Sequence, residues 1–179
     1  MAYTSAINAW ASGNSPEKAK RAWNLFLKMQ DRYKDGDLSI KPNDVSLTAV
    51  MNACAHIPKR SSTEHQQNAL RIALEAQNIL LQDGDNSNEY GTANSVTFKT
   101  LIIVFGKLIP SVARRRHFVS VAFERCCKEG QVDESILRVL KTYTPDLHAK
   151  LPANKELPNE WSRNIRKGRR SKVNREINL

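Results

Sequence analysis

Basic side chains are the residues best suited to chemistry in this 179-residue sequence, and they are concentrated near its end. The range 161–179 holds seven basic residues and one acid, a net charge of +6 out of the +10 of the whole chain. Lysine and arginine at this density favour an anionic partner, with nucleic acid the first candidate, and the alternative is a solvated extension without a partner. The seven residues are Arg163, Arg166, Lys167, Arg169, Arg170, Lys172 and Arg175.

The spacing of the candidate residues indicates neither a catalytic site nor a metal site. The four histidines are scattered: His56, His65, His117 and His148. Neither Cys54 nor the adjacent pair Cys126 and Cys127 has metal-ligand spacing, which favours reduced thiols in an intracellular compartment. The sequence contains neither a phosphate-binding glycine loop nor a glycine-flanked serine elbow. We therefore expect no enzyme, no cofactor and no metal.

The elements that would position a binding site are helices, because one amphipathic pattern occurs three times. Its copies lie at 2–12, 43–55 and 93–106. Tyr3, Leu47 and Phe98 occupy the same position in the three copies, and apolar residues follow at i+3, i+4 and i+7. This spacing forms one face of a helix. The sequence therefore predicts three equivalent helices.

A second repeated feature follows each copy, namely a longer amphipathic segment that ends at Gly36, Gly84 or Gly130. Glycine suits the left-handed residue that closes a helix. The repeating unit is thus a helix pair, which is typical of an α-solenoid. We expect an all-α solenoid of antiparallel pairs, about three repeats plus a half, over 1–143, and an irregular basic tail over 144–179.

The sequence of these units resembles the pentatricopeptide repeat family. The stretches VSL at 45–47 and VTF at 96–98, each followed by two aliphatic residues, resemble the opening of such a repeat. The stretch AWNLFLKM at 22–29, a glycine and IKPN at 40–43 resemble its second half. The range 126–140 resembles a terminal repeat of plant or algal type. Since the first copy lacks a capping residue, we expect the C-terminal portion of a longer array.

The resemblance implies binding of single-stranded RNA, one base per repeat, with two side chains of each repeat reading the base. Carried onto this sequence, the base-reading pairs are Thr4 with Asn43 and Thr48 with Asn94. A threonine with an asparagine implies adenine in both repeats. Val45 and Val96 take the position that packs against base faces. The alternative is that the threonines are ordinary first-turn residues and the asparagines only helix caps.

Other basic residues are predicted to contact RNA phosphates. Lys99 occupies the position that Thr4 and Thr48 hold in the other copies, which favours a phosphate contact over base reading. Three adjacent arginines on a helix point in three directions, so they cannot all face one RNA strand, and a solvated helix start is the alternative. The predicted phosphate contacts are Lys99, Arg114, Arg115, Arg116, Arg163, Arg166, Arg169 and Arg170.

Two alternative functions remain at this stage. One is a protein-interaction solenoid of tetratricopeptide type, and the other is a scaffold that contacts RNA through the basic tail alone. The family resemblance implies a role in organellar RNA processing, stability or translation, with other proteins of an RNA-processing complex as further partners. It also implies a mitochondrial or plastid location, although no transit peptide is visible after Met1. No segment is long and apolar enough for a membrane.

Overall fold

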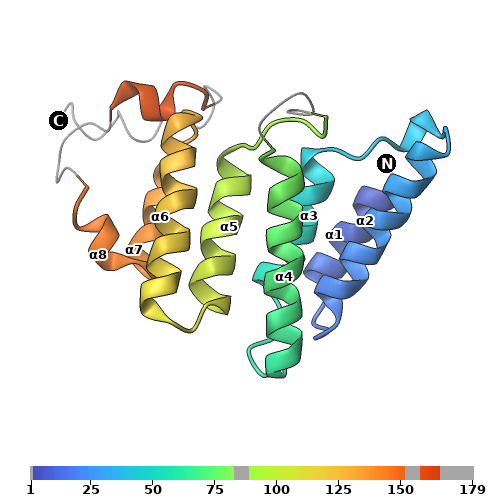
Figure 1. The fold of residues 1–179 in the computed structure, drawn as a ribbon, viewed down its shortest axis with the longest axis horizontal. Coiled ribbons are helices and arrows are strands. Elements are labelled where there is room, and N and C mark those ends of the chain that lie inside the picture. Colours follow the sequence, from blue (N-terminus) through green and yellow to red (C-terminus); the bar gives the residue numbers. More distant parts are fainter. Residues whose placement is uncertain (1, 83–88, 152–157, 166–179) are drawn as a thin grey trace. The chain divides into compact units, whose positions relative to one another are not determined.

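In the computed structural model, which describes residues 2–82, 89–151 and 158–165, every regular element of the described residues is a helix. The all-α class predicted from the sequence is confirmed. The chain divides into an N-terminal unit, Met1–Ala93, and a C-terminal unit, Asn94–Leu179. Figure 1 labels the helices of both.

The N-terminal unit consists of two helix pairs joined by a short 3-10 turn. Its elements are α1 (Ala2–Ser12), α2 (Lys18–Lys34), η1 (Leu38–Ile40), α3 (Asp44–Ala55) and α4 (Thr63–Leu80). Helix α1 packs against both α2 and α3, and α2 also packs against α3 and α4. Within this unit, each helix of the first pair therefore contacts its counterpart in the second pair.

The C-terminal unit begins with one helix pair and continues with shorter elements. These are α5 (Ser95–Leu108), α6 (Val112–Lys128), α7 (Glu134–Tyr143), α8 (Pro145–His148) and η2 (Asn159–Ser162). Helices α5 and α6 run side by side in opposite directions (Figure 1), α7 packs on α5, and η2 packs on α6. The described part of the predicted tail is therefore folded: it contains α8 and η2, where the sequence had suggested irregular chain.

The hydrophobic faces predicted from the pattern form the cores of the two units. Leu47, Val50, Met51 and Cys54 of α3 are all fully buried, as expected from the spacing. The corresponding face of α5 includes Phe98, Leu101, Ile102 and Phe105, also buried. The α2 face is buried at Ala19, Ala22, Trp23, Phe26 and Met29. Packing of these apolar faces, rather than helix propensity, is what stabilises such short helices.

The two described glycines of the repeated pattern end their helices in the same way. Gly36 follows α2 with φ +103, and Gly130 follows α6 with φ +65. Gly36 N donates to Tyr33 O and Asp37 N to Arg32 O, and Gly130 and Gln131 donate to Cys127 O and Cys126 O. Both are Schellman motifs, whose left-handed position favours glycine. Gly84 lies outside the described residues.

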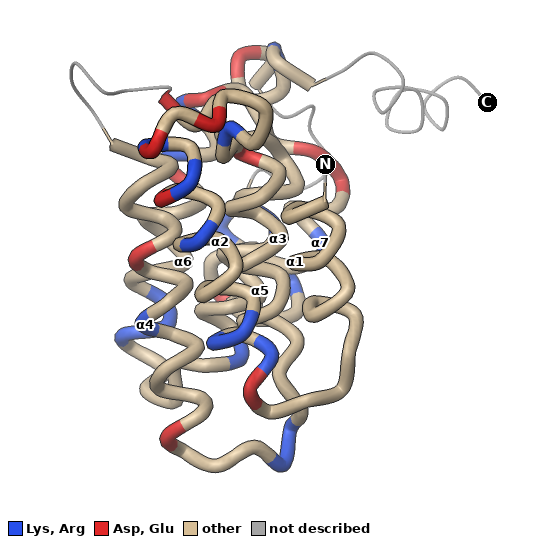
Figure 2. The backbone as a smooth tube through the Cα atoms, turned by 90° about the vertical axis from the view of Figure 1, so that its right-hand side faces the viewer, with Lys and Arg blue, Asp and Glu red and all other residues tan. Residues whose placement is uncertain are grey.

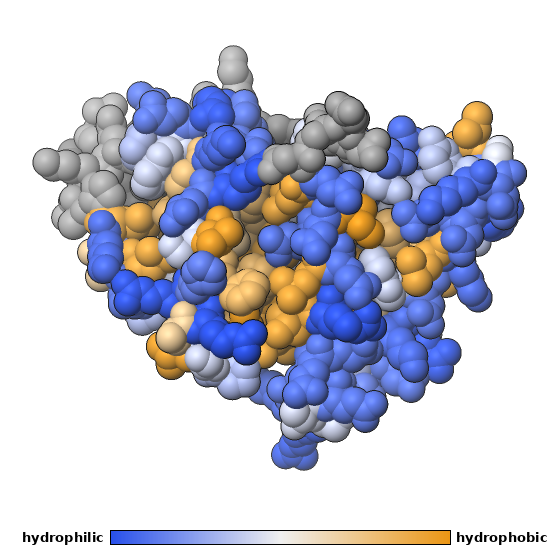
Figure 3. All heavy atoms as spheres, in the orientation of Figure 1, coloured by the Kyte–Doolittle hydropathy of each residue, from blue (hydrophilic) through white to orange (hydrophobic). Residues whose placement is uncertain are grey.

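The charged surface is mixed within each unit. Lys and Arg are spread along the helices with acidic residues between them (Figure 2). Hydrophilic and hydrophobic side chains both reach the face shown in Figure 3. Among the described residues, the exposed large hydrophobic ones are Trp10, Leu38, Val45, Val112 and Val121. Single exposed apolar residues are ordinary on a protein surface, so exposure alone does not mark a binding site.

Candidate nucleic-acid interface

The N-terminus of α3 is built around Asn43, the predicted base reader. Its extended backbone turns the amide oxygen Oδ1 toward the helix, where it accepts a hydrogen bond from Ser46 N at 2.9 Å. Ser46 Oγ in turn accepts from Asn43 N at 3.0 Å, which completes a reciprocal capping box. The amide nitrogen Nδ2 of Asn43 has no partner among the described residues. The cap therefore fixes Asn43 as a hydrogen-bond donor toward solvent.

The same box is repeated at the N-terminus of α5, around Asn94. Its Oδ1 accepts from Val96 N at 2.9 Å and from Thr97 N at 3.3 Å, and Thr97 Oγ1 accepts from Asn94 N at 3.4 Å. Asp133 caps α7 by accepting from Ile136 N at 3.0 Å. Asn43, Asn94 and Asp133 are therefore all helix caps, so the capping interpretation of the asparagines is correct whatever else they do.

The other residues predicted to contact RNA bases or phosphates near these positions lie close to the N-terminal ends of α1, α3 and α5. Thr4 on α1 and Thr48 on α3 are half-buried, as are Val96 and Lys99 on α5. Val45 is 52% exposed, an unusual state for a valine in a helix that is otherwise largely buried. Thr4 and Asn43 belong to one unit, whereas Thr48 and Asn94 belong to different units. Only the first predicted pair, Thr4 with Asn43, therefore lies within a single unit.

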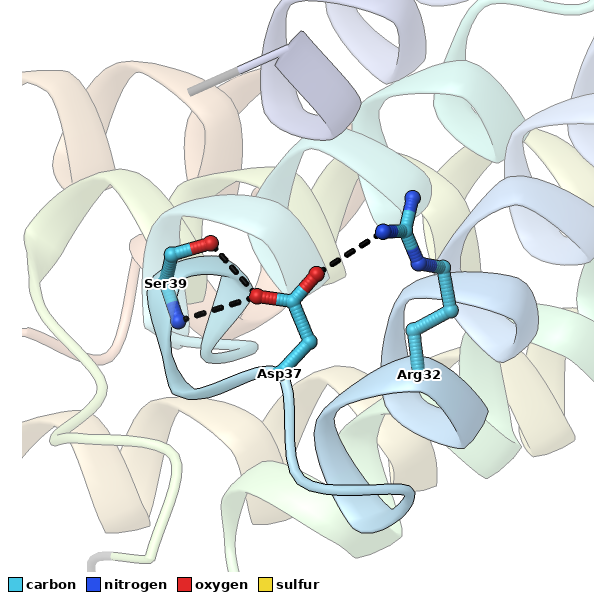
Figure 4. A network of polar contacts seen from close by, with 3 residues as sticks. All are labelled: Arg32, Asp37 and Ser39. Carbon is cyan, nitrogen blue, oxygen red and sulfur yellow. Dashed lines mark hydrogen bonds and ion pairs between the residues drawn. The ribbon is translucent and has the colours of Figure 1, made fainter.

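A polar network fixes the connection between α2 and α3, just before Asn43 (Figure 4). Arg32 Nη2 lies 2.8 Å from Asp37 Oδ2, and Ser39 donates to Asp37 Oδ1 from Oγ at 2.6 Å and from N at 3.3 Å. The Ser39 hydrogen bonds and the Arg32 charge lower the pKa of Asp37. A hydrogen bond with the Tyr3 side chain raises the pKa of Arg32. Tyr3 precedes Thr4, so the network links the start of α1 to the loop that leads to Asn43.

Sequence reasoning missed Tyr90, which lies in the polar insertion 83–92 between α4 and α5. Tyr90 OH accepts from Gln30 Nε2 at 2.7 Å, and its ring lies 6.4 Å from the Phe26 ring. The next residue, Gly91, lies so close to Asp44 that an added Cβ would be 3.1 Å from Asp44 Oδ1. The end of the insertion therefore packs on α2 and beside the N-terminus of α3. A lone tyrosine in a polar loop was its only sequence signal.

The three adjacent arginines at the start of α6 have different surroundings, as expected from their helical positions. Arg115 Nη1 donates to Gly106 O at 3.4 Å, and Arg116 Nε lies 3.0 Å from Asp146 Oδ2. The side chain of Arg114 is exposed and has no ion pair or hydrogen bond within the part of the chain that the structure describes. Among the three, Arg114 is thus the one best placed for a phosphate.

The predicted phosphate contacts at the end of the chain are only partly described. Arg163 donates to the carbonyl oxygens of Lys128 and Glu160, so its guanidinium is held against the end of α6. Arg166, Arg169 and Arg170 lie outside the described residues.

The cysteines are poor nucleophiles in this fold. Cys54 and Cys126 are buried and Cys127 is half-buried, and all three are free. Burial raises the pKa of Cys54 and of Cys127 to about 12 each, and raises that of Cys126 as well. Thiolates are the reactive form, so these residues are packed thiols.

The described residues include neither a metal-binding cluster nor a membrane-spanning helix. They contain no group of three or more His, Cys, Asp or Glu side chains that could hold a metal ion. Over the same ranges, no helix combines the length and the apolar character needed to span a bilayer.

Comparison with protein-family models, with curated proteins and with solved structures found no significant match to this chain.

Proposed function

We propose that this chain binds single-stranded RNA and selects bases with side chains at the N-terminal ends of α1, α3 and α5, in the manner of a pentatricopeptide repeat protein. The resemblance of the repeated units to pentatricopeptide repeats motivates the proposal. The same resemblance leads us to propose an organellar location and a role in RNA processing, stability or translation. The helix pairs would then stack as an α-solenoid. The support comes from features within each unit.

The helix packing within the units supports a repeated architecture. In the N-terminal unit α1 packs on α3 and α2 on α4, and in the C-terminal unit α7 packs on α5. Equivalent helices of successive pairs are therefore neighbours, as they are in a solenoid. The Schellman motifs after α2 and α6 and the caps before α3, α5 and α7 recur at equivalent positions. Each repeat thus presents its cap residue in the same local geometry.

The hydrogen bonding of the Asn43 side chain is the main support for the proposal. Its amide oxygen caps α3 while its amide nitrogen is left with no partner among the described residues. Val45, two residues later, is 52% exposed. A fixed hydrogen-bond donor beside an exposed aliphatic side chain is the combination that a nucleobase needs, namely an edge contact and a face contact.

The chemistry of this pair agrees with the adenine preference that the resemblance implies. The Watson–Crick edge of adenine has one acceptor, N1, and one donor group, the N6 amine. Asn43 Nδ2 can donate to N1, and the Thr4 hydroxyl can accept from N6. Uracil presents an N–H donor where adenine has N1, which leaves the Asn43 donor facing another donor. The site therefore favours adenine over uracil at this repeat.

The α5 repeat is proposed to bind the backbone instead. Lys99 holds the position of Thr4 and Thr48, and an ammonium group there neutralises a phosphate without reading a base. Arg114 on α6 adds a second cation in the same unit.

The decisive experiment separates base reading from helix capping at Asn43. Aspartate caps as well as asparagine, but it can only accept hydrogen bonds. Asn43→Asp should keep the stability of the wild-type chain and lose its preference for oligo(A) over oligo(U). Asn43→Ala, the control for the cap, should also lower the free energy of unfolding by about 1 kcal/mol. If Asn43→Asp retains the wild-type preference, Asn43 is only a cap and base reading by this repeat is wrong.

A further inference from the structure

We propose that Asn8 on α1 and Asn52 on α3, here called the carboxamide pair, bind ribose 2′-hydroxyl groups of the RNA and so select RNA over DNA. The inference rests on the proposed function, because the pair lies next to threonines that are proposed to read bases. It adds sugar recognition to a site that is otherwise assigned to bases alone.

The two asparagines hold equivalent positions in successive repeats of the N-terminal unit. Asn8 follows Thr4 by four residues, and Asn52 follows Thr48 by four residues. Residues at this spacing lie on the same face of a helix, about 6 Å apart along its axis. Helix α1 packs against α3 within this unit. The carboxamide pair therefore lies one helical turn beyond the threonines on each of two neighbouring helices.

Asn52 belongs to the narrow part of α3 that a ligand can reach. Of the 12 residues of this helix, all are buried except Asp44, Val45, Thr48 and Asn52. The last three follow one another at intervals of three and four residues, which places them in one stripe along the helix. Asn52 is half-buried, and Asn8 on α1 is exposed. A nucleotide bound at Val45 and Thr48 therefore meets Asn52 as the next side chain of the stripe.

The side-chain amides of the pair have no hydrogen-bond partner among the described residues, although the backbone beside them does. Ser12 Oγ donates to Asn8 O at 3.0 Å, and His56 Nδ1 lies 3.0 Å from Asn52 O. Asparagine is a poorer helix former than alanine, so an unpaired asparagine inside a helix costs stability. Residues that break a local rule without a structural gain are expected at functional sites.

The charges around the pair favour a neutral ligand group over a phosphate. Helix α1 contains no charged residue, and Asp44 is the only one in α3. Phosphates are bound chiefly by lysine and arginine, which both helices lack. In α5 the position of Asn52 is taken by Ile103, which lies between Lys99 and Lys107. The α5 repeat thus suits phosphates, whereas the α1 and α3 repeats suit uncharged parts of a nucleotide.

The ribose hydroxyl is the uncharged group that matches a carboxamide best. An asparagine side chain donates from Nδ2 and accepts at Oδ1, and a 2′-hydroxyl group likewise donates and accepts. The sugar is bonded directly to the base, so a side chain one turn from a base-reading threonine is at a suitable distance to meet it. This hydroxyl group is also what distinguishes RNA from DNA. The carboxamide pair is therefore assigned to sugar selection.

The test measures binding of the full chain to short oligo(A) strands with three sugars: ribose, 2′-deoxyribose and 2′-fluoro-2′-deoxyribose. The fluoro sugar keeps the ribose-like pucker but has no hydroxyl group. The pair variant is Asn8→Ala with Asn52→Ala. The control variant, Asn24→Ala with Asn78→Ala, removes exposed asparagines from α2 and α4. Both variants should fold, because alanine is the better helix former, and circular dichroism checks this.

The wild type and the control variant should prefer ribose over both other sugars by about fivefold for each hydroxyl contact, the effect of one net hydrogen bond. The pair variant should lose this preference and bind the ribose strand more weakly. It should keep the wild-type preference for oligo(A) over oligo(U), since the base readers are unchanged.

Equal binding of the three sugars by the wild type, or an unchanged sugar preference in the pair variant, would overturn the role of the pair. A wild type that rejects deoxyribose but accepts the fluoro sugar would read the pucker and not the hydroxyl group, which also overturns it. A wild type without preference for oligo(A) over oligo(U) would contradict the proposed base reading instead, and the comparison of sugars would still decide the role of the carboxamide pair.

Discussion

Lys18 Nζ donates to the carbonyl oxygen of His56 at 3.1 Å, which joins the start of α2 to the end of α3. The same ammonium group donates to Gly13 O at 2.7 Å, just after α1. Lys18 is 2% exposed. Its charge is tolerated in the interior because it meets the negative ends of two helices and satisfies carbonyl groups that helix geometry leaves without partners.

Changing Lys18 to methionine should therefore destabilise the N-terminal unit. Methionine keeps most of the volume of the side-chain stem but leaves the Gly13 and His56 carbonyl groups without this donor. Hydrogen bonds made by a charged group contribute about 1.5–3 kcal/mol. Chemical denaturation measures the change, and Lys20→Met on the exposed side of α2 is the matched control. Equal stability of the two variants would mean that the ammonium contacts contribute nothing.

Gly106 on α5 lies against Tyr143 of α7, and an added Cβ would be 2.3 Å from Tyr143 Cγ. An alanine inside a helix normally stabilises it by about 1 kcal/mol relative to glycine. Overpacking costs about 1–3 kcal/mol. Here the obstructing atoms belong to Tyr143, a partly buried side chain whose pKa is raised by burial. We expect the clash to exceed the helix preference.

Gly106→Ala should accordingly lower the thermal stability of the C-terminal unit. The double variant with Tyr143→Ala should recover part of this loss, because removing the ring makes room for the new methyl group. A double-mutant cycle on the free energy of unfolding measures that coupling. Additive effects of the two changes would contradict direct packing between the residues.

The sequence predicted local features well and long-range ones poorly. The caps at Asn43, Asn94 and Asp133 and the buried face of α3 follow from neighbours within one turn, and local spacing reveals them. Ser15 is less easily interpreted: its Oγ accepts from Glu17 N at 3.2 Å, yet α2 begins only at Lys18.

Contacts between residues that are far apart in the sequence leave no local pattern of this kind. The burial of Lys18 depends on a carbonyl group 38 residues later in the sequence. The side chains of Arg163 and Asn164 donate to carbonyl groups 35 residues earlier. Hydrophobic periodicity carries no signal for a lysine or an asparagine that bonds to backbone groups elsewhere in the fold. Base reading stays a prediction, since the caps explain the asparagines without it.

The pKa of Asp37 predicts how the α2–α3 connection responds to pH. The folded pKa is lowered by the Ser39 hydrogen bonds and by Arg32, so the native state favours the charged form. This contribution is present above the ordinary aspartate pKa of about 4 and is lost as pH falls through the lower folded value. Asp37→Asn should therefore be less stable than wild type at neutral pH, and the difference should shrink below about pH 4. A constant difference would mean that the charge is irrelevant.

Val45 offers a test of the face contact that is independent of hydrogen bonding. Because it is 52% exposed, Val45→Ala removes little buried surface and should leave the stability of the N-terminal unit nearly unchanged. If the side chain packs on a base, the variant loses the burial of about one methylene equivalent, about 0.8 kcal/mol, or roughly fourfold in affinity. The loss should be similar for oligo(A) and oligo(U), because a face contact does not distinguish bases as the proposed Asn43 hydrogen bond would.

The matched control for Val45 is Val121→Ala on α6, a helical valine that is 48% exposed and has no predicted role in binding. Both variants remove the same two methyl groups from a similar environment, so a general effect of lost surface hydrophobicity would weaken RNA binding equally in both. A selective loss at Val45, measured by fluorescence anisotropy at fixed salt, locates the base contact at the N-terminus of α3. Equal affinities for the two variants would remove Val45 from the site and leave cations as the source of RNA binding by this chain.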